Sequence, residues 1–445
     1  MDEDVLQEGV FFALQEPEHV ANPYPLYHRL RSQAPFHWDF VLGGWFLTRY
    51  ADVRAALADP RLTTKNFPFD VSQLPSGLQD ELAPFGRVTE REVLYNDAPA
   101  HDRLRRPLNR AFNPAAFERL RPGMETLADE LLGNAERRGS MNVVSDYSEP
   151  LADYMMGELL GLPDSNRAEF IQCCDRLKQF ATARRMGHDT VLRAKEAVKS
   201  FEVVRAHVRT IIAARRENFA DDVIGRAFAI QPNETPPTED EVLANCVFFL
   251  HAGARNMSAS ITNGVAALLQ HPEQFARLRE DPRLIAVAVE ELLRYETPVQ
   301  VAIRGVPERI EFAGRSVGPK QLLVLLLGAA NRDPEQFADP DRLDLTRHPN
   351  RHVSFGAGAH GCVGGWMARF GLAIAIEAIL HRQSDLRFTP RKLQWNLPAM
   401  QRTLRALPLL IGRQLRSSHR LRSHTASTPS QTLTKVAQTP IPALR

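Results

Sequence analysis

The strongest hydrophobic pattern in this chain runs from Glu239 to about Leu269, where apolar residues occupy nearly every side of a helix. A helix with that pattern is normally buried. Thr238 followed by Glu241 has the spacing of a capping box, which predicts where the helix begins. At about 1.5 Å per residue, such a helix could cross a whole domain.

Weaker patterns surround this segment. Residues 37–50 alternate around a Gly-Gly pair, which predicts a β-hairpin, and residues 300–327 are rich in strand patterns. Several prolines and glycines in residues 61–96 predict a long loop. Most of residues 101–230 has helical spacing, and a final long helix is expected from Gly364. Together the patterns predict a mainly α fold with a minor β component.

Composition is that of an ordinary globular protein. Apolar residues make up 44% and charged residues 24% of the 445 residues, and the formal net charge of +2 gives no sign of nucleic-acid binding. Residues 413–445 carry six basic residues and no acidic ones, and they are rich in Ser, Thr, Gln and Pro. We expect a single domain over residues 1–412 and a basic, disordered tail over residues 413–445. The tail is either a solvated extension without a role or a segment that docks on an acidic partner or a membrane.

Cysteine usage and the N-terminal sequence bear on location. A disulfide scaffold would have more than four cysteines in a shorter chain, and no CxxC pair suggests zinc. The chain starts with acidic residues and lacks the apolar core of a signal peptide. No apolar run approaches the ~18 residues of a membrane span. We therefore expect a cytoplasmic protein with reduced thiols and no transmembrane segment.

One local motif, HVSFGAGAHGCVGG at residues 352–365, points to chemistry. Gly356, Gly358 and Gly361 precede Cys362. Glycines let a flat surface approach the backbone closely, and loop amides at the start of a helix stabilise a thiolate. The pattern is expected to hold a deprotonated cysteine, although a glycine-rich turn with an incidental buried cysteine is the alternative.

This motif, Phe355-Gly-x-Gly-x-His360-x-Cys362-x-Gly364, resembles the heme-binding loop of the cytochromes P-450. The resemblance implies that the Cys362 thiolate is the proximal ligand of the iron in heme b. It also implies that Phe355 packs over this ligand and that His360 lies near a heme propionate. The resemblance covers roughly residues 20–412 and implies the cytochrome P-450 fold, with heme between the long central helix and the helix after the cysteine.

Other segments match the same family. Glu291-Leu-Leu-Arg294 resembles its ExxR motif, in which two side chains on one helix face can pair. Arg342, in the proline-rich meander, is implied as the partner of that pair. Four further side chains are implied as propionate contacts, and each of them taken alone would be a surface cation. They are His101, Arg105, Arg304 and His352.

The central helix departs from the family where dioxygen is expected to bind. Most members carry a small-residue pair followed by an acid and an alcohol, but this chain has Ala252-Gly253-Ala254-Arg255-Asn256. The glycine still leaves room for dioxygen. A guanidinium only donates hydrogen bonds, so Arg255 cannot relay protons as a carboxylate does. Asn256 can both donate and accept, and could hold a water or the distal oxygen.

Gly253, Arg255 and Asn256 are thus the candidate catalytic residues, and three interpretations of Arg255 stay open. It pairs with a carboxylate on a covering helix while Asn256 orients water. Alternatively, it binds an anionic group of the substrate beside the iron. In the third interpretation, the enzyme uses peroxide in place of a reduced ferredoxin.

The resemblance implies a heme-thiolate monooxygenase that inserts one oxygen atom from O2 into a C–H bond of a lipophilic small molecule. If Arg255 reaches the substrate, a terpenoid-like acid fits. Electrons would come from a ferredoxin and an NAD(P)H-dependent reductase, and we expect a monomer. The non-enzymatic alternatives are a heme-based sensor or carrier and a helical binding protein without heme.

An acidic ferredoxin is expected to dock on Arg103, Arg106, Arg110 and Arg369. The side chains expected to line the cavity are Phe248, Phe249, His251, Val299, Val301, Ile303, Ala399 and Met400.

Overall fold

The structure is a computed structural model that describes residues 9–65, 71–72, 74–183, 190–228, 234–382, 385–388, 393–396 and 400–412. Residues Met1–Arg413 form one compact unit. The expected tail, 413–445, lies outside the described residues, as does Ala399. None of the helices in the described ranges has the length and apolar character needed to cross a bilayer.

Helix dominates the described residues, as the patterns predict. The α-helices are α2 (Val10–Ala13), α3 (Pro17–Ala21), α4 (Tyr24–Gln33), α5 (Tyr50–Ala58), α6 (Ser76–Thr89), α7 (Ala100–Ala111), α8 (Pro114–Glu118), α9 (Arg121–Arg138), α10 (Glu149–Leu160), α11 (Asp164–Ala183), α12 (Thr190–Glu217), α13 (Val223–Phe228), α14 (Glu239–Gln270), α15 (Pro272–Glu280), α16 (Ile285–Tyr295), α17 (Leu327–Ala330) and α18 (Gly365–His381). Single turns of other helix types are η1 (Val93–Tyr95), the π-helical η2 (Val144–Ser148) and η3 (Pro282–Leu284).

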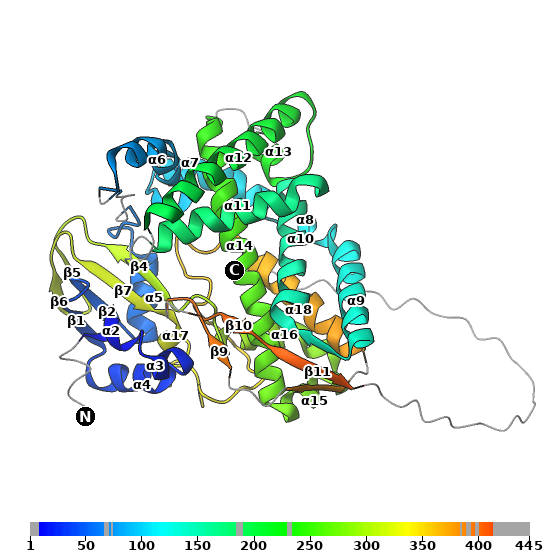
Figure 1. Ribbon diagram of the computed structural model, residues 1–445. Helices are drawn as coiled ribbons and strands as arrows, with labels where there is room; N and C mark the ends of the chain where they lie inside the picture. Colours follow the sequence, from blue (N-terminus) through cyan, green and yellow to red (C-terminus); the bar gives the residue numbers. More distant parts are fainter. Residues whose placement is uncertain are drawn as a thin grey trace, which may run out of the picture. The chain divides into compact units, whose positions relative to one another are not determined.

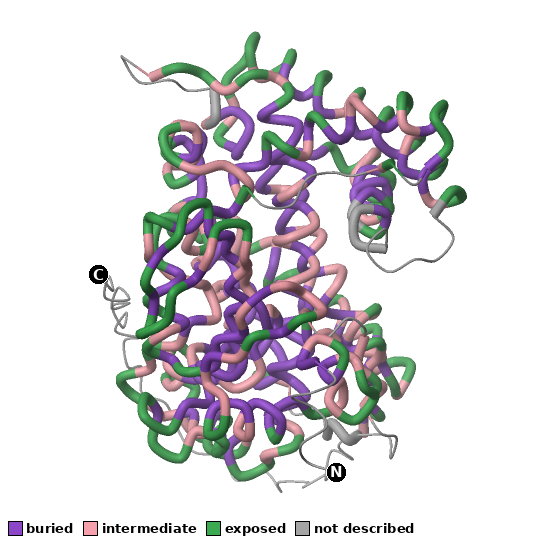
Figure 2. Tube along the Cα trace, turned by 90° about the vertical axis from the view of Figure 1, so that its left-hand side faces the viewer, coloured by how far each residue is buried: buried purple, intermediate pink, exposed green. Residues whose placement is uncertain are grey.

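The long central helix forms where the sequence predicts it. Both bonds of the capping box are present: Thr238 Oγ1 accepts from the Glu241 amide at 3.2 Å, and Glu241 Oε2 accepts from the Thr238 amide at 2.8 Å. Helix α14 packs against α10, α16 and α18, and Figure 1 shows it crossing the centre of the helical part of the fold. Most of its residues are buried, and Figure 2 shows in purple how buried residues gather in the interior of the fold.

The strands form a main sheet beside the helices and three smaller ones. The main sheet has the order β1-β2-β7-β4, in which only β2 and β7 pair in parallel. The predicted hairpin is confirmed, since Trp38 pairs with Trp45 across β1 and β2. The small sheets have the orders β3-β11-β8, β10-β9 and β5-β6. The strands are β1 (Phe36–Asp39), β2 (Gly44–Leu47), β3 (Ser140–Asn142), β4 (Val301–Gly305), β5 (Ile310–Phe312), β6 (Arg315–Val317), β7 (Leu322–Leu326), β8 (Asp385–Phe388), β9 (Gln394–Trp395), β10 (Leu404–Ala406) and β11 (Pro408–Gly412).

The expectation of a loop throughout residues 61–96 is wrong, because the segment contains the four-turn helix α6. Leu78, Leu82 and Phe85 recur at helical spacing and are buried. This apolar face outweighs the local cost of Pro84, which lies inside the helix. In the sequence alone, Pro84 indicates a helix break, although Leu78, Leu82 and Phe85 have helical spacing.

Candidate active site

The cysteine loop folds as a tight turn against α5, just before α18 begins. Gly356 and Gly358 have φ angles of +67° and +71°, which side chains rarely adopt. A Cβ on Gly358 would also lie 2.8 Å from Ala58 Cα, so a glycine is needed for the loop to approach α5 this closely. The Cys362 amide donates to the Phe355 carbonyl at 2.8 Å and closes the turn.

Cys362 faces a large cavity, and for that reason its side chain is accessible. Burial by the surrounding protein raises the pKa of the thiol, while the Gly364 amide and the charges of Arg105 and Arg369 lower it only in part. A coordinated metal ion deprotonates a thiol outright, so bound iron would favour the expected thiolate over the thiol.

The cavity has an empty volume of about 1320 Å³, which includes space open to solvent. Most of the wall is apolar, and it is built by α14, α10, α18, β4 and the cysteine loop. Its apolar side chains include Val93, Phe112, Met156, Phe248, Phe249 and Val299.

Some of the expected lining residues face elsewhere. Phe248, Phe249 and Val299 line the cavity, but His251, Val301, Ile303 and Met400 do not. The error on β4 is one of register, because alternate residues of a strand face opposite sides. Ala302 and Arg304 face the cavity, whereas Val301 and Ile303 pack in the core beside α4.

Four basic side chains lie close together on the cavity wall: His101, Arg105, Arg304 and His360. The rings of His101 and His360 lie 4.3 Å apart, and His101 Nε2 is buried without a hydrogen-bond partner in the described part of the chain. Burial lowers the pKa of both guanidinium groups. It also lowers the pKa of His360 to about 4, helped by the neighbouring His101 and the positive arginines. His360 is therefore uncharged near neutral pH, and the positive charge comes from the two arginines. We call these four residues the cationic cluster, and an anion bound there would offset the charge of Arg105 and Arg304.

His352 does not join the cationic cluster, so its expected propionate contact is corrected. Its Nε2 lies 3.1 Å from Glu290 Oε2, and the residue is not part of the cavity wall. The Glu290 carboxylate also accepts from Arg369, with Nη2 and Oε2 2.9 Å apart. A partly buried acid on α16 thus holds His352 away from the cavity.

The ExxR pair is completed by a different arginine from the one expected. Arg294 Nε and Nη2 donate to the two Glu291 carboxylate oxygens at 2.7 and 2.8 Å, and both side chains are fully buried. Arg342 contributes only its carbonyl oxygen, 3.4 Å from Arg294 Nη2. Arg347 instead places Nε 3.2 and 3.1 Å from the two Glu291 oxygens. The Asp344 amide donates to Glu291 Oε1 at 2.9 Å, so the chain passes the carboxylate after Arg342.

The structure separates the three candidate catalytic residues. Gly253 and Asn256 line the cavity, and the buried Asn256 Oδ1 has no hydrogen-bond partner among the described residues. Arg255 points away from the cavity, toward α10 and α11. Its Nη2 lies 2.7 Å from Asp153 Oδ1 and its Nη1 3.1 Å from Glu149 Oε1. Placing Arg255 beside the substrate is therefore corrected. Its carboxylate partners are those of the first interpretation, and the water held by Asn256 stays a prediction.

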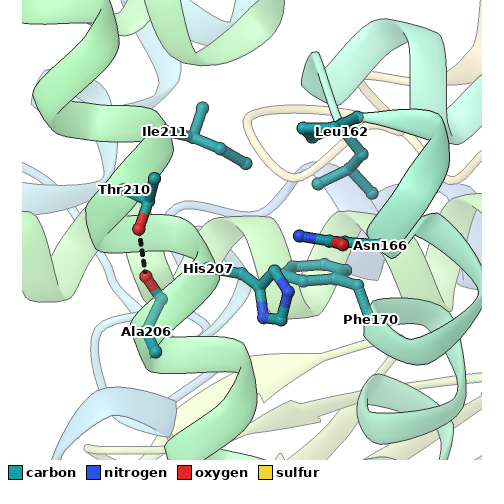
Figure 3. A pocket seen from close by; sticks show the side chains of 8 residues that line it. Leu162, Asn166, Phe170, Ala206, His207, Thr210 and Ile211 are labelled. Atoms are coloured by element: carbon teal, nitrogen blue, oxygen red, sulfur yellow. Dashed lines mark hydrogen bonds between the residues drawn. The ribbon is translucent and has the colours of Figure 1, made fainter.

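A second pocket lies between α11 and α12, and Figure 3 shows it from close by. Phe170 and Ile211 give it an apolar wall, and His207 faces the Phe170 ring edge-on at 6.1 Å. The Thr210 hydroxyl donates to the Ala206 carbonyl of its own helix at 3.0 Å. Without a cysteine or a cationic cluster in its lining, this pocket is unlike the cavity at Cys362.

Comparison with known proteins identifies the family. Residues 138–392 match the family described as Cytochrome P450. The biotin biosynthesis cytochrome P450 of Bacillus subtilis (strain 168) is 32% identical over 88% of this chain and 97% of its own length. The cytochrome P450 monooxygenase PikC of Streptomyces venezuelae is 31% identical over 88% of this chain and 91% of its own length.

Solved structures agree. CalO2 matches with a TM-score of 0.81 at 30% identity, over 89% of this chain and 98% of CalO2. P450BioI in complex with a hexadec-9Z-enoic acid ligated acyl carrier protein matches with a TM-score of 0.79 at 32% identity, over 88% of this chain and 99% of P450BioI. This chain belongs to the cytochrome P450 family, and it is a heme-thiolate monooxygenase.

The residues present fit a heme. Cys362 offers its sulfur to the cavity from a loop whose glycines let a flat group approach closely. The cationic cluster, with its unpartnered His101 Nε2, suits the two propionates. A thiolate ligand pushes electron density onto the iron and favours cleavage of the O–O bond. His101, Arg105, Arg304, His360 and Cys362 are the residues that would hold the group.

Proposed function

We propose that this monooxygenase inserts one oxygen atom from O2 into a C–H bond of a lipophilic small molecule, with electrons from a ferredoxin. The observation that carries the proposal is the large cavity at Cys362, whose wall is apolar outside the cationic cluster and a few polar side chains. Binding there is driven by burial of apolar surface, so the substrate is a mid-sized lipophilic molecule.

The protein's own groups prepare the site for this reaction. When bound, heme supplies the activation of dioxygen. The small Ala252-Gly253 pair leaves space on α14 beside the cavity. Asn256 Oδ1 accepts a hydrogen bond from a water or a substrate donor, because nothing among the described residues occupies it. Apolar side chains exclude bulk water around these groups.

The proposed substrate class is tested by a binding screen that follows the heme absorption spectrum. Terpenoid acids, fatty acids and their methyl esters form the panel, together with acyl carrier protein adducts because one relative binds such an adduct. Arg255 is not among the described residues that line the cavity, and it pairs with Asp153. It therefore does not bind a substrate carboxylate there. We expect lipophilic acids and their esters to give similar spectral shifts, and a response confined to small polar molecules would overturn the proposal.

We propose that electrons reach the heme from an acidic ferredoxin, reduced by an NAD(P)H-dependent reductase, and that the protein works as a monomer in the cytoplasm. Of the four arginines expected to dock it, Arg103 pairs with Glu241 and Arg110 with Glu234. Arg369 pairs with Glu290. Arg106 is exposed on α7.

This electron-transfer proposal is tested by the rate at which a reduced ferredoxin reduces the heme. Complementary charge mainly raises the association rate and makes it sensitive to salt. Arg106→Glu should lower that rate several-fold at low ionic strength, and the difference should shrink in high salt. The same rate in the variant and in the unaltered enzyme at every salt concentration would contradict the docking surface. Full turnover with peroxide and none with ferredoxin would favour the peroxide-using alternative.

A further inference from the structure

A cluster of charged side chains lies behind the wall of the cavity, and α10, α11 and α14 all contribute to it. Arg255 is its centre, with Asp153 Oδ1 2.7 Å from Nη2, Glu149 Oε1 3.1 Å from Nη1 and Asp175 Oδ1 3.4 Å from Nε. His251 Nδ1 lies 3.5 Å from the same Asp175 oxygen. Three carboxylates therefore surround one guanidinium, and we call these five residues the Arg255 cluster.

The Arg255 cluster lies between bulk water and the cavity. Its three carboxylate side chains and its guanidinium keep between 22% and 38% of their surface exposed, so protons from the solvent can reach them. On the inner side, Met156 follows Asp153 by one turn of α10 and lines the cavity. Asn256 follows Arg255 directly on α14 and also lines it.

Two adjacent residues of α14 carry buried polar atoms that form no hydrogen bond within the described ranges. Arg255 Nε is buried and makes no hydrogen bond within the described ranges, since its approach to Asp175 has poor geometry. Asn256 Oδ1, facing the cavity, is likewise buried and unpaired there. Buried polar groups without protein partners are the usual positions of ordered water. Water bound to these two atoms would connect the Arg255 cluster with the cavity.

We propose that Asp153 supplies protons to the cavity through water held by Arg255 and Asn256, and that Arg255 is the positioning residue of this path. Most members of the family carry this acid on the central helix. Here Asp153 on α10 would have its role, and Arg255 occupies its position on α14. This inference rests on the proposed function, and it concerns how the protons of that reaction arrive.

The proton balance of the reaction is complete. Dioxygen takes two electrons from the ferredoxin and two protons; one oxygen atom enters the substrate C–H bond and the other leaves as water. Asp153 loses a proton from its carboxyl group to the adjacent water, and the resulting carboxylate takes up another proton from the solvent on its exposed side.

The protonation of Asp153 suits this task. Burial raises the pKa of Asp153 to about 6. The negative charges of Asp175 on α11 and Glu149 on α10 also raise it, whereas the positive charge of Arg255 on α14 lowers it. His251, also on α14, faces Asp175. About a tenth of such a carboxyl group is protonated at pH 7, and a proton donor works best when its pKa lies near the working pH.

Asp153→Asn is the test, with Glu158→Gln as its matched control. Glu158 is also an α10 acid paired with an arginine, since its Oε1 lies 2.6 Å from Arg167 Nη2, but it does not line the cavity or join the Arg255 cluster. The measurements are product formed and peroxide released per NAD(P)H consumed, the solvent isotope effect and the pH profile of turnover. The reduced carbon monoxide spectrum checks that heme is bound.

In Asp153→Asn we expect the product per NAD(P)H to fall by about tenfold or more, as for loss of a general acid. Peroxide release and the solvent isotope effect should rise, and the inflection near pH 6 should disappear. Glu158→Gln should behave as the unaltered enzyme does, and Asp153→Glu should restore most of the coupling. Unchanged coupling, isotope effect and pH profile in Asp153→Asn would overturn the inference.

Hydrogen peroxide separates proton supply from structural damage, because it brings both electrons and both protons with it. Asp153→Asn should keep its peroxide-driven turnover, whereas equal losses with peroxide and with ferredoxin would show a structural role and also overturn the inference.

If Asp153→Asn does not fold, the same comparison is made with Asp175→Asn and Arg255→Lys, which keep Asp153. Arg255→Lys should impair ferredoxin-driven coupling more than peroxide-driven turnover, and wild-type behaviour in both variants would count against the path. Failure of the unaltered enzyme to form any product would instead contradict the proposed function.

Discussion

Arg347 Nε lies 3.1 Å from Glu291 Oε2, an oxygen that also accepts from Arg294 Nε at 2.7 Å. Glu291 is fully buried, so its charge depends on these two guanidinium groups and on the Asp344 amide. The contact fastens α16 to the meander that leads to the cysteine loop. Glu291 is not among the described residues that line the cavity, so we expect its role to be structural.

Glu291→Ala should destabilise the protein by roughly 3–5 kcal/mol, because it leaves buried arginine charge uncompensated. Arg347→Ala should cost about 1–3 kcal/mol, because the buried Glu291 carboxylate loses the hydrogen bonds from Arg347 and keeps those from Arg294. The matched control is Arg342→Ala, which removes an exposed side chain and should change stability little. Urea denaturation and heme content report the effects, and equal losses in the two arginine variants would refute the assignment of Arg347.

Cys362→Ala should abolish the thiolate-type absorption of the reduced carbon monoxide complex, because Cys362 alone among the four cysteines lines the cavity. Cys246→Ala provides the control, since Cys246 is buried in the helical core. That variant should retain the absorption maximum of the unaltered protein. A normal spectrum in Cys362→Ala would show that a different group ligates the iron.

Arg255→Leu should not change the ratio between the affinities for a lipophilic acid and for its methyl ester, since Arg255 pairs with Asp153 and not with the contents of the cavity. The variant should also lose about 1–3 kcal/mol of stability, because three carboxylates then face one another without their cation. Spectral titration and thermal unfolding measure the two effects. A tenfold or larger loss confined to the acid would restore Arg255 as a substrate ligand.

These results separate what the sequence could predict from what it could not. The capping box and the apolar run placed α14 correctly, because both signals are local in the sequence. The direction of Arg255 depends on Asp153 on α10 and Asp175 on α11, two helices that come much earlier in the sequence than α14. No local pattern specifies such long-range neighbours.

The same distinction explains the other corrections. On β4 the strand pattern was visible, but a shift of one residue exchanges the two faces, and Ala302 took the position expected of Val301. His352 pairs with Glu290, and Glu291 pairs with Arg347. In a meander without regular structure, several cations lie within a few residues of one another, and the sequence does not show which of them reaches the carboxylate. The type of side chain was predictable there, and the pairing was not.

Glu290 predicts a dependence of stability on pH. Burial alone would raise its pKa, but hydrogen bonds from His352 and Arg369 overcome this and lower it to about 2. Because the folded-state pKa lies below the ordinary value near 4.5, this group stabilises the fold above about pH 4.5 and loses its contribution as the pH falls toward 2. The contribution is at most ~3 kcal/mol.

Glu290→Gln should therefore be less stable than the unaltered protein at pH 7, and the difference should shrink steadily between pH 4.5 and 2. Urea denaturation at a series of pH values measures it, at equal heme content. Glu311→Gln, which changes an exposed acid on β5, is the control and should follow the unaltered protein throughout. A difference that stayed constant with pH would mean that Glu290 acts by packing instead of by charge.

Gly253 predicts an effect on the shape of the cavity that is separate from stability. A Cβ at this position would lie 2.5 Å from Met156 Sδ and 3.2 Å from Met367 Cε, and both methionines line the cavity. Methionine side chains are flexible, so Gly253→Ala should displace Met156 at small cost. Alanine also favours a helix over glycine by about 1 kcal/mol, so the stability should change by less than that amount.

The displaced side chain should instead change which molecules fit. Gly253→Ala should weaken the binding of the bulkiest ligands by about tenfold while smaller ones bind as before, measured by spectral titration over a series of increasing size. Gly264→Ala is the matched control, because Gly264 lies on the same helix, packs against Leu372 and is not part of the cavity wall. If both variants affected every ligand equally, Gly253 would matter for the packing of α14 and not for the size of the substrate.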